Sequence, residues 1–480
     1  MSEQIPPPPA TVRFREPGTV TTSLPRVDAN MPIDSTLIPG RTIRPIDLVN
    51  VLRLAGVRNL DIALARQQVN QALAEMQRTR SLWLPSLFLG PTYYRADGQV
   101  QTVQGQVINV NRSSLFLGGT AATVNGFPAP AAGTGYPQLN SLSSVMRISD
   151  AIFEPLAAQR ATAASRAAVQ VRTNDALLQV AEGYLDLQQA AGRLAIAREA
   201  ADNAGVLTSI TAAYARTGEG READHRRALV ELRRQRNYVQ QASGQLLIAS
   251  TDLVRLLVLD PRLVVAPLEP AETPLRLVPE ETPLDELIVL GLRRRPELAQ
   301  SRELVEAAII RAKQARLRPY IPSVATTYAG GGLGGGQGEF FGNFGARGDF
   351  MASLFWELQH LGFSDRAIMR RTDAERRSAA IQLQQIEQNV AADVAAAFAL
   401  RAAAARQIEE CKAALVDAIE SHELNAENLV RGAGLPRATR PLEVLQPIQA
   451  LAQARLDYLE AVLSYNRAQF RLKRAIGEQP

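Results

Sequence analysis

Apolar and polar residues alternate with a period of two from Phe344 to Trp356, which is the pattern of a strand with two different faces. One face has apolar or small residues, and the other includes Arg347, Asp349 and Ser353. Three residues depart from the alternation, namely Gly345, Met351 and Phe355. A tilted strand crosses a bilayer with about 9–11 residues, so the pattern predicts a strand that is long enough to do so.

Two much longer segments have the composition of helices. Residues 364–431 contain neither proline nor glycine, and residues 156–217 are interrupted only by three glycines. At ~1.5 Å per residue, the first would form a helix of about 100 Å. Helices in globular proteins rarely exceed about 25 residues, so these lengths predict a coiled-coil or tubular setting.

Each long segment ends in a turn that contains glycine, at 217–224 and at 431–441. A shorter helical segment then returns, 221–257 in the first case and 442–476 in the second. The sequence therefore predicts two helical hairpins with exposed tips.

The two hairpins belong to a pattern that occurs twice. Helix-forming residues run from Ile46 to Arg80 and again up to Leu317, and similar junctions, WLPSL at 83–87 and YIPSV at 320–324, lead into a strand. A turn-rich stretch is expected after each first strand, at 95–138 and at 329–343, with a second strand after it. In the first half that second strand has a weaker alternation, from Leu142 to Ile152.

This order predicts two internal repeats, residues 46–258 and 285–477. The remaining segments contain many prolines and are not expected to be helical. They are an N-terminal linker at 1–45 and a crossover at 259–284, with a short tail at 478–480.

Composition narrows the class of protein. With 46% hydrophobic and 21% charged residues the chain is expected to fold, and 5% aromatic residues with alanine-rich runs suit closely packed helices. A net charge of +5 without a clustered basic face does not indicate nucleic-acid binding. No apolar run reaches the ~18–20 residues of a transmembrane helix, so the chain is either soluble or crosses a membrane as strands.

The residue types of common catalytic and metal sites are scarce. Cys411 is the single cysteine, and the three histidines are scattered, so no disulfide or zinc framework is expected. No acid–base pair or nucleophile triad stands out, which predicts a protein that is not an enzyme and has no cofactor. The first residues also lack the basic and apolar regions of a secretion signal.

The order of helix, strand, strand, long helix, tip and helix occurs twice over residues 46–477. Short motifs accompany it, namely the helix-to-strand junctions, RPEL at 295–298, Thr217-Gly218 followed by Asp224 and Ala228, LEVL at 442–445, Tyr465, Asn466 and Ala468, and AIG at 475–477. In this order and with these motifs, the chain resembles the TolC-like family of outer membrane efflux proteins.

The resemblance implies a mainly α fold and a homotrimer. Four strands per chain would close a 12-stranded β-barrel in the outer membrane, and the helical hairpins would form a trimeric α-barrel tube in the periplasm. Arg347, Asp349 and Ser353 would then face a water-filled lumen. Such a channel is the exit duct of a tripartite efflux or type I secretion system. Its implied partners are a periplasmic adaptor (membrane fusion protein), an inner membrane pump and outer membrane lipid.

The resemblance also assigns roles to the hairpin tips. Asp224 and Glu443 would form acidic rings at the periplasmic gate, whereas Gln446 stands where the family has a second acidic residue. Four glycines would contact the adaptor, namely Gly218, Gly220, Gly432 and Gly434. Helix capping by the acidic residues and turn formation by the glycines are the alternatives.

A soluble coiled-coil scaffold or adaptor protein is a second hypothesis for the whole chain. It accounts for the long helices but leaves the alternating strand at 344–356 unexplained.

Overall fold

The computed structural model describes residues 42–84, 86–122, 129–130, 142–218, 220–336, 344–357, 359–431 and 445–479. These residues divide into two compact units, and each unit takes segments from both halves of the chain. The helical unit contains 42–63, 172–295 and 390–479, and the sheet unit contains 64–171 and 296–389. The division into repeats at residues 258 and 285 stays a prediction.

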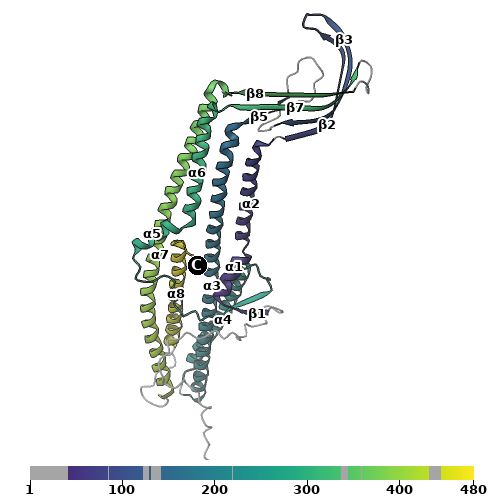
Figure 1. Cartoon of the computed structure of the whole chain (residues 1–480). Helices are drawn as coiled ribbons and strands as arrows, with labels where there is room; N and C mark the ends of the chain where they lie inside the picture. The colour runs from purple at the N-terminus through teal and green to yellow at the C-terminus, as the bar shows by residue number, and fades with distance from the viewer. Residues whose placement is uncertain are drawn as a thin grey trace, which may run out of the picture. The chain divides into compact units, whose positions relative to one another are not determined.

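The helical unit consists of long helices and one small sheet (Figure 1). Its elements are β1 (Thr42–Ile46), α1 (Leu48–Arg58), most of α3 (Ile148–Thr217), α4 (Glu222–Leu256), β6 (Leu263–Pro267), α5 (Leu284–Arg294), the second part of α7 (Phe363–Arg431) and α8 (Leu445–Ala475). α3 has 70 residues and α7 has 69, so the two long helices predicted from the sequence are present.

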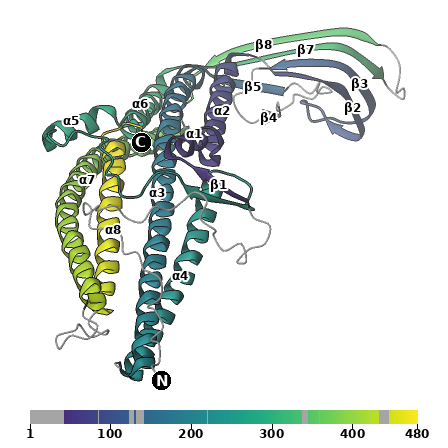
Figure 2. The ribbon, with the colours of Figure 1, turned by 90° about the horizontal axis from the view of Figure 1, so that it is seen from below.

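The four long helices of this unit lie in the order α4, α3, α8, α7 (Figure 2). α4 packs on α3 through a cluster that includes Leu246 and Leu194. On its other side α3 packs against α8, and α8 packs against α7, in a cluster that includes Leu185, Leu459 and Leu415. α4 and α7 are therefore the two outer helices of the layer.

Ion pairs accompany the apolar packing between α3 and α8. Five of them join the two antiparallel helices, namely Asp175–Arg474 at 2.6 Å, Glu182–Arg471 at 2.6 Å, Asp186–Arg467 at 2.5 Å, Arg193–Glu460 at 3.7 Å and Glu199–Arg455. Between them Gly192 leaves room for Leu459, because a Cβ at Gly192 would lie 2.7 Å from the leucine Cδ2. The interface is thus both close-packed and lined with charge.

The crossover segment, predicted to be non-helical, contains the strand β6, which pairs in parallel with β1. Two glutamates of this segment are held in the same way. The Tyr184 hydroxyl of α3 donates to Glu269, and the Tyr465 hydroxyl of α8 donates to Glu280 at 2.8 Å. The segment is therefore anchored to one helix of each hairpin.

The sheet unit carries the long strands. Its elements are most of α2 (Leu60–Arg80), η1 (Ser81–Trp83), β2 (Ser86–Gln101), β3 (Val107–Ala122), β4 (Ala129–Pro130), β5 (Leu142–Arg147), the start of α3, α6 (Pro296–Leu317), η2 (Arg318–Tyr320), β7 (Ser323–Gly336), β8 (Gly345–Phe355), η3 (Gln359–Gly362) and the start of α7. None of the helices in the described ranges combines the length and apolar character required to cross a membrane.

The strands form an antiparallel sheet around β7. One side of β7 pairs with β8, from Ser323 opposite Phe355 to Leu333 opposite Gly345. Its other side pairs with β5 near its beginning and with β3 towards its end, and β3 pairs in turn with β2. Among the described strands, β2 and β8 each have a partner on one side only.

The described parts of the predicted turn-rich stretches, 95–122 and 329–336, are largely strand. β2 and β3 together cover most of 86–122, with only a tight turn at 102–106 between them, and β7 continues to Gly336. The reason lies across the sheet, where glycines of neighbouring strands meet, as in the pairs Gly118–Gly331 and Gly330–Gly348. Glycine has a low intrinsic strand propensity, and pairing with partner strands overrides it here.

The helix predicted over 46–80 is interrupted at Asn59, and the helix that ends at Leu317 is interrupted at Arg295. Asn59 caps α2, because its side-chain oxygen accepts the Asp61 N–H at 2.8 Å. Arg295 has an extended backbone and precedes Pro296, the first residue of α6. Both helical segments of the sequence are therefore pairs of helices.

Candidate functional site: a hairpin tip and two strand edges

The tip of the first hairpin is a tight turn that depends on glycine. α3 ends at Thr217, and Gly218 follows with φ +81, a left-handed conformation that ends helices. The Gly220 N–H donates to the Tyr214 carbonyl at 3.0 Å, and a Cβ at Gly220 would lie only 2.8 Å from the Tyr214 Cβ. Turn formation is sufficient to require both glycines, and contact with an adaptor stays a prediction.

Asp224 lies in the first turn of α4, at the same tip. Its side chain is 20% exposed, and its carboxylate is 3.8 Å from the Arg227 guanidinium. An acidic residue in the first turn favours a helix, so the position also fits the capping alternative. A role for Asp224 in an acidic ring at the gate stays a prediction.

The start of α8 lies beside this tip. Leu445 and Ile448 pack with Leu207 and Tyr214 near the end of α3, which brings the beginning of α8 close to the first hairpin turn. Gln446 is the second residue of α8, and its side chain is exposed. Glu443, Gly432 and Gly434 lie outside the described residues.

The three polar positions predicted to face a lumen all lie on β8. Arg347 stands opposite Gly331 of β7, Asp349 opposite Ala329, and Ser353 opposite Ala325. Ser353 is exposed. The three are separated by two and four residues, and an even spacing places them on one face of the strand.

The other face of β8 carries large apolar side chains that are exposed in the single chain. Phe350 is 72% exposed, Leu354 56% and Trp356, just beyond the strand, 61%. The Trp356 indole N–H donates to the Tyr320 carbonyl at 3.3 Å, which fixes one end of this apolar face. An edge strand with apolar side chains and unpaired backbone groups is a surface that proteins normally cover.

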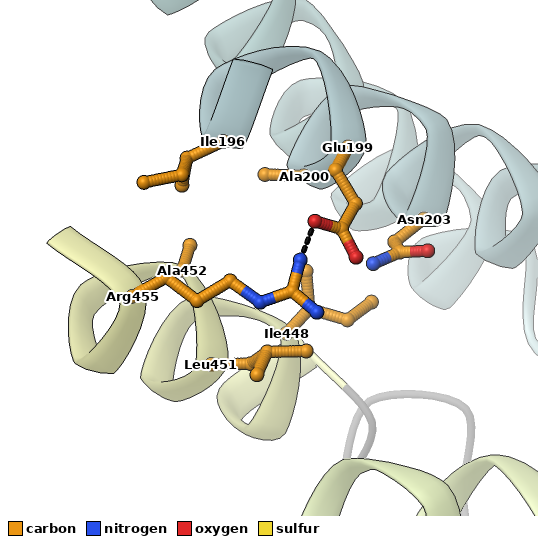
Figure 3. A pocket seen from close by; sticks show the side chains of 8 residues that line it. All are labelled: Ile196, Glu199, Ala200, Asn203, Ile448, Leu451, Ala452 and Arg455. Atoms are coloured by element: carbon orange, nitrogen blue, oxygen red, sulfur yellow. Dashed lines mark ion pairs between the residues drawn. The ribbon is translucent and has the colours of Figure 1, made fainter. Parts of the chain in front are cut away.

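A small cavity between α3 and α8 surrounds an ion pair that sequence reasoning missed (Figure 3). Arg455 of α8 extends to Glu199 of α3, with Asn203 beside the carboxylate. Apolar side chains line the rest of the cavity, namely Ile196, Ala200, Ile448, Leu451 and Ala452. Burial lowers the pKa of Arg455 to about 10, so the guanidinium remains charged at neutral pH.

A signal for this pair existed in the sequence. Arg455 lies four residues after Leu451 and four before Leu459, both of which are buried. A charged residue on an otherwise apolar stripe of a helix requires a partner when the helix packs. The sequence does not indicate which acidic residue provides it.

Cys411, the one cysteine, is half-buried beside the cluster that joins α7 and α8. Burial raises the pKa of its thiol, and the nearby Asp457 and Glu410 carboxylates raise it further. We therefore expect maleimide to label Cys411 at pH 7.5 at least about threefold more slowly than an exposed thiol, because the thiolate is the reactive species. The comparison is Gln407→Cys in a Cys411→Ser background, since Gln407 is exposed on the same helix. Equal rates in the native state would contradict this expectation.

Among the described residues, no group of three or more histidine, cysteine, aspartate and glutamate side chains is placed to hold a metal ion.

Solved structures provide the comparison with known proteins. The outer membrane channel OprN matches with a TM-score of 0.72 and 18% identity, over 90% of this chain and 91% of its own. The CmeC outer membrane channel of Campylobacter jejuni has a TM-score of 0.71 and 15% identity, over 90% and 85% of the two chains. The outer membrane protein VceC of Vibrio cholerae has a TM-score of 0.70 and 14% identity, over 90% and 96%.

The sequence matches no protein-family model and none of the curated proteins. Likeness at this level of identity establishes the fold. The predicted fold class, with long helical hairpins and a smaller part made of strands, is confirmed.

Proposed function

We propose that this chain, which has the TolC-like fold of outer membrane efflux channels, is one subunit of a homotrimeric channel in the outer membrane. The channel would be the exit duct of a tripartite efflux or type I secretion system and would pass small molecules or proteins to the exterior. The observation that carries the proposal is the match of nine-tenths of the chain to such channels, together with the open edges of its sheet.

The sheet supports assembly with further copies. β8 has 11 residues and β2 has 16, and each lacks a second partner among the described strands. In lipid, unpaired backbone N–H and C=O groups are costly, so the edges must pair with other strands. Four long strands from each of three chains would close into a 12-stranded β-barrel, with Phe350 and Leu354 towards lipid and Arg347, Asp349 and Ser353 towards the lumen.

The helical unit supports the second part of the channel. Its four long helices form a layer with two outer helices, and three copies would supply twelve helices for a tube. The tips would lie at the periplasmic end, where Asp224 and Glu443 form the gate and the four glycines contact an adaptor driven by an inner membrane pump. Opening would be a shift between two packings that adaptor binding favours, and it involves no catalytic step.

The scaffold hypothesis does not account for the sheet unit. A soluble coiled-coil protein has no use for an edge strand with an exposed apolar face such as that of β8. The same face is required in a protein that pairs its strands in a membrane.

The test is the mass of the detergent-solubilised particle, followed by conductance in a planar bilayer. We expect a particle of three chains of 52.1 kDa each and discrete conductance steps. A monomer or dimer that stays in solution without detergent would overturn the proposal and favour the scaffold. Trimers with no conductance would point to a closed gate, which the adaptor hairpin should then open.

The gate can be tested at Gln446, where the family pattern has an acidic residue. We expect Gln446→Asp to raise cation over anion permeability on the order of twofold, because three added carboxylates strengthen the negative field at the constriction. The matched control is Gln446→Asn, which has the size of the aspartate variant but remains neutral like the native glutamine. An aspartate variant with unchanged reversal potentials would place Gln446 outside the conducting path.

A further inference from the structure

The outer surface of α4 carries a stripe of exposed residues at coiled-coil spacing. Ala228, Glu231 and Gln235 are buried on the side of α4 that faces α3. On the opposite side lie residues spaced alternately by four and three, namely Arg226, Val230, Arg233, Asn237 and Gln240, and all of them are exposed. We call this set the α4 stripe. Val230 is 67% exposed, which is unusual for an apolar residue on a long helix.

The outer surface of α7 carries a corresponding stripe. Ala404, Ile408 and Leu415 are buried against α8 and α3. On the opposite side, again spaced alternately by four and three, lie Ala399, Ala403, Arg406, Glu410, Ala413, Asp417, Glu420 and Leu424, all exposed. We call this set the α7 stripe. A stripe with this spacing is what a second helix packs against, and its alanines permit a close approach.

The two stripes have opposite charges at 226–233 of α4 and at 410–420 of α7. The α4 stripe has Arg226 and Arg233, and the α7 stripe has Glu410, Asp417 and Glu420. Arg226 pairs with Glu222 on its own helix, whereas Arg233, Asp417 and Glu420 form no ion pair within the part of the chain that the structure describes. Each stripe therefore has unpaired charges that the other could satisfy.

The charges also lie at about the same level along the layer of helices. Thr208 of α3 donates to the Ala228 carbonyl of α4, and the adjacent Leu207 contacts Ile448 of α8. About nine residues further up α8, the Asp457 carboxylate is close enough to Cys411 of α7 to raise the pKa of its thiol, and Cys411 packs beside the cluster that contains the adjacent Tyr458. Because α7 runs antiparallel to α8 with the same rise per residue, Ala228 is level with a residue within about one turn of Glu420.

We propose that the α4 stripe of one copy packs against the α7 stripe of the next copy, antiparallel, with Arg233 opposite Asp417. The pairing rests on the homotrimer proposed above and names its lateral contact in the helical unit. It joins different surfaces head to tail, which is the kind of contact that closes into a ring of three. Because the two helices are antiparallel, the pairing of Arg233 with Asp417 also places Val230 opposite Glu420 and Asn237 opposite Ala413.

Charge reversal tests the pairing in detergent-solubilised full-length protein. We expect Arg233→Glu to lower the ratio of trimer to monomer roughly tenfold, at a dilution where the unaltered protein partly dissociates, because three contacts become repulsive. Asp417→Arg should do the same, and the two changes together should restore the ratio. The control is Arg236→Glu, since Arg236 is exposed on α4 but off the stripe.

Disulfide trapping tests the register directly. In a Cys411→Ser background, Arg233→Cys with Asp417→Cys should form dimers and trimers linked between chains on mild oxidation. The matched control is Arg233→Cys with Ala399→Cys, which lies on the same stripe about 27 Å higher at ~1.5 Å per residue. The pairing would be overturned if the trimer resisted charge reversal and if residue 233 formed disulfides with residue 417 no better than with residue 399. That result would leave the proposed channel function unaffected. A particle that is monomeric before any substitution would instead overturn the proposed function.

Discussion

Gly477→Ala is expected to lower the free energy of unfolding by about 3 kcal/mol, the largest effect we expect from a single methyl group in this chain. Gly477 has φ +85 and follows α8. The Gly477 N–H donates to the Arg474 carbonyl at 3.0 Å, and the Glu478 N–H donates to the Lys473 carbonyl at 3.1 Å. These two bonds form a Schellman motif. A Cβ there would lie 2.7 Å from the Arg294 carbonyl carbon and 2.8 Å from the Arg295 nitrogen, and neither backbone atom can turn aside.

The measurement is the denaturant midpoint of helical circular dichroism in detergent. Gly56→Ala is the matched control, because a Cβ at Gly56 would meet nothing within 4 Å and the residue lies inside helix α1. There the same change should be neutral or should stabilise by up to ~1 kcal/mol. If both variants unfolded at the same midpoint, the end of α8 would not be fixed against the junction of α5 and α6.

The second large effect concerns Arg455 and Glu199. Arg455→Met should lower the free energy of unfolding by about 2 kcal/mol, because it leaves the Glu199 carboxylate facing apolar side chains without its partner. Breaking a fully buried pair costs about 3–5 kcal/mol, and the 31% exposure of the Glu199 side chain reduces this. Adding Glu199→Leu should recover most of the loss, since an apolar pair suits the cavity.

Arg193→Met serves as the control at the same interface. Arg193 and Glu460 are 3.7 Å apart with side chains 40% and 60% exposed, so its loss should change stability by no more than about 0.5 kcal/mol. Equal effects of Arg193→Met and Arg455→Met, or no recovery in the double variant, would mean that burial does not distinguish the two pairs. Both results come from the same denaturant titration.

The helices were predictable because their signals are local. The absence of proline and glycine placed one long helix at 364–431, and the structure has Phe363–Arg431. The other was expected from 156, just after Pro155. It begins instead at Ile148 and contains the proline. Proline leaves the Ala151 carbonyl without its helical donor, and the Trp83 indole N–H, 68 residues away in sequence, donates to it at 3.2 Å. No local pattern could have shown that compensation.

The breaks at Asn59 and Arg295 were predictable and were not predicted. Asn59 is a preferred N-cap residue, and Arg295 precedes a proline, which disfavours helical backbone. The sheet is different, because the strand at 329–336 is rich in glycine and is a strand only through its neighbours. Information of this kind lies in pairs of residues far apart and not in any window of the sequence.

For the site, the sequence placed Gly218 and Gly220 in the turn that precedes Asp224, as the structure has them. It did not indicate that Arg455 pairs with Glu199, or that the α4 and α7 stripes lie at the same level along the layer. Both facts depend on which helices are neighbours. The order α4, α3, α8, α7 follows from core packing between segments of different halves. Charge on a helix surface becomes interpretable only once that order is known.

The long-range pairing in this fold restricts how the chain can be made. Asp175 and its partner Arg474 are 299 residues apart, and β3 pairs with β7 through residues as distant as Ser113 and Gly336. At ~5–20 residues per second, the β2–β3 hairpin is synthesised many seconds before the strand that it needs. During that interval its edges and apolar side chains are without native partners and are prone to aggregate. Biogenesis of this protein should therefore depend on a factor that holds the first half unfolded until the second half is complete.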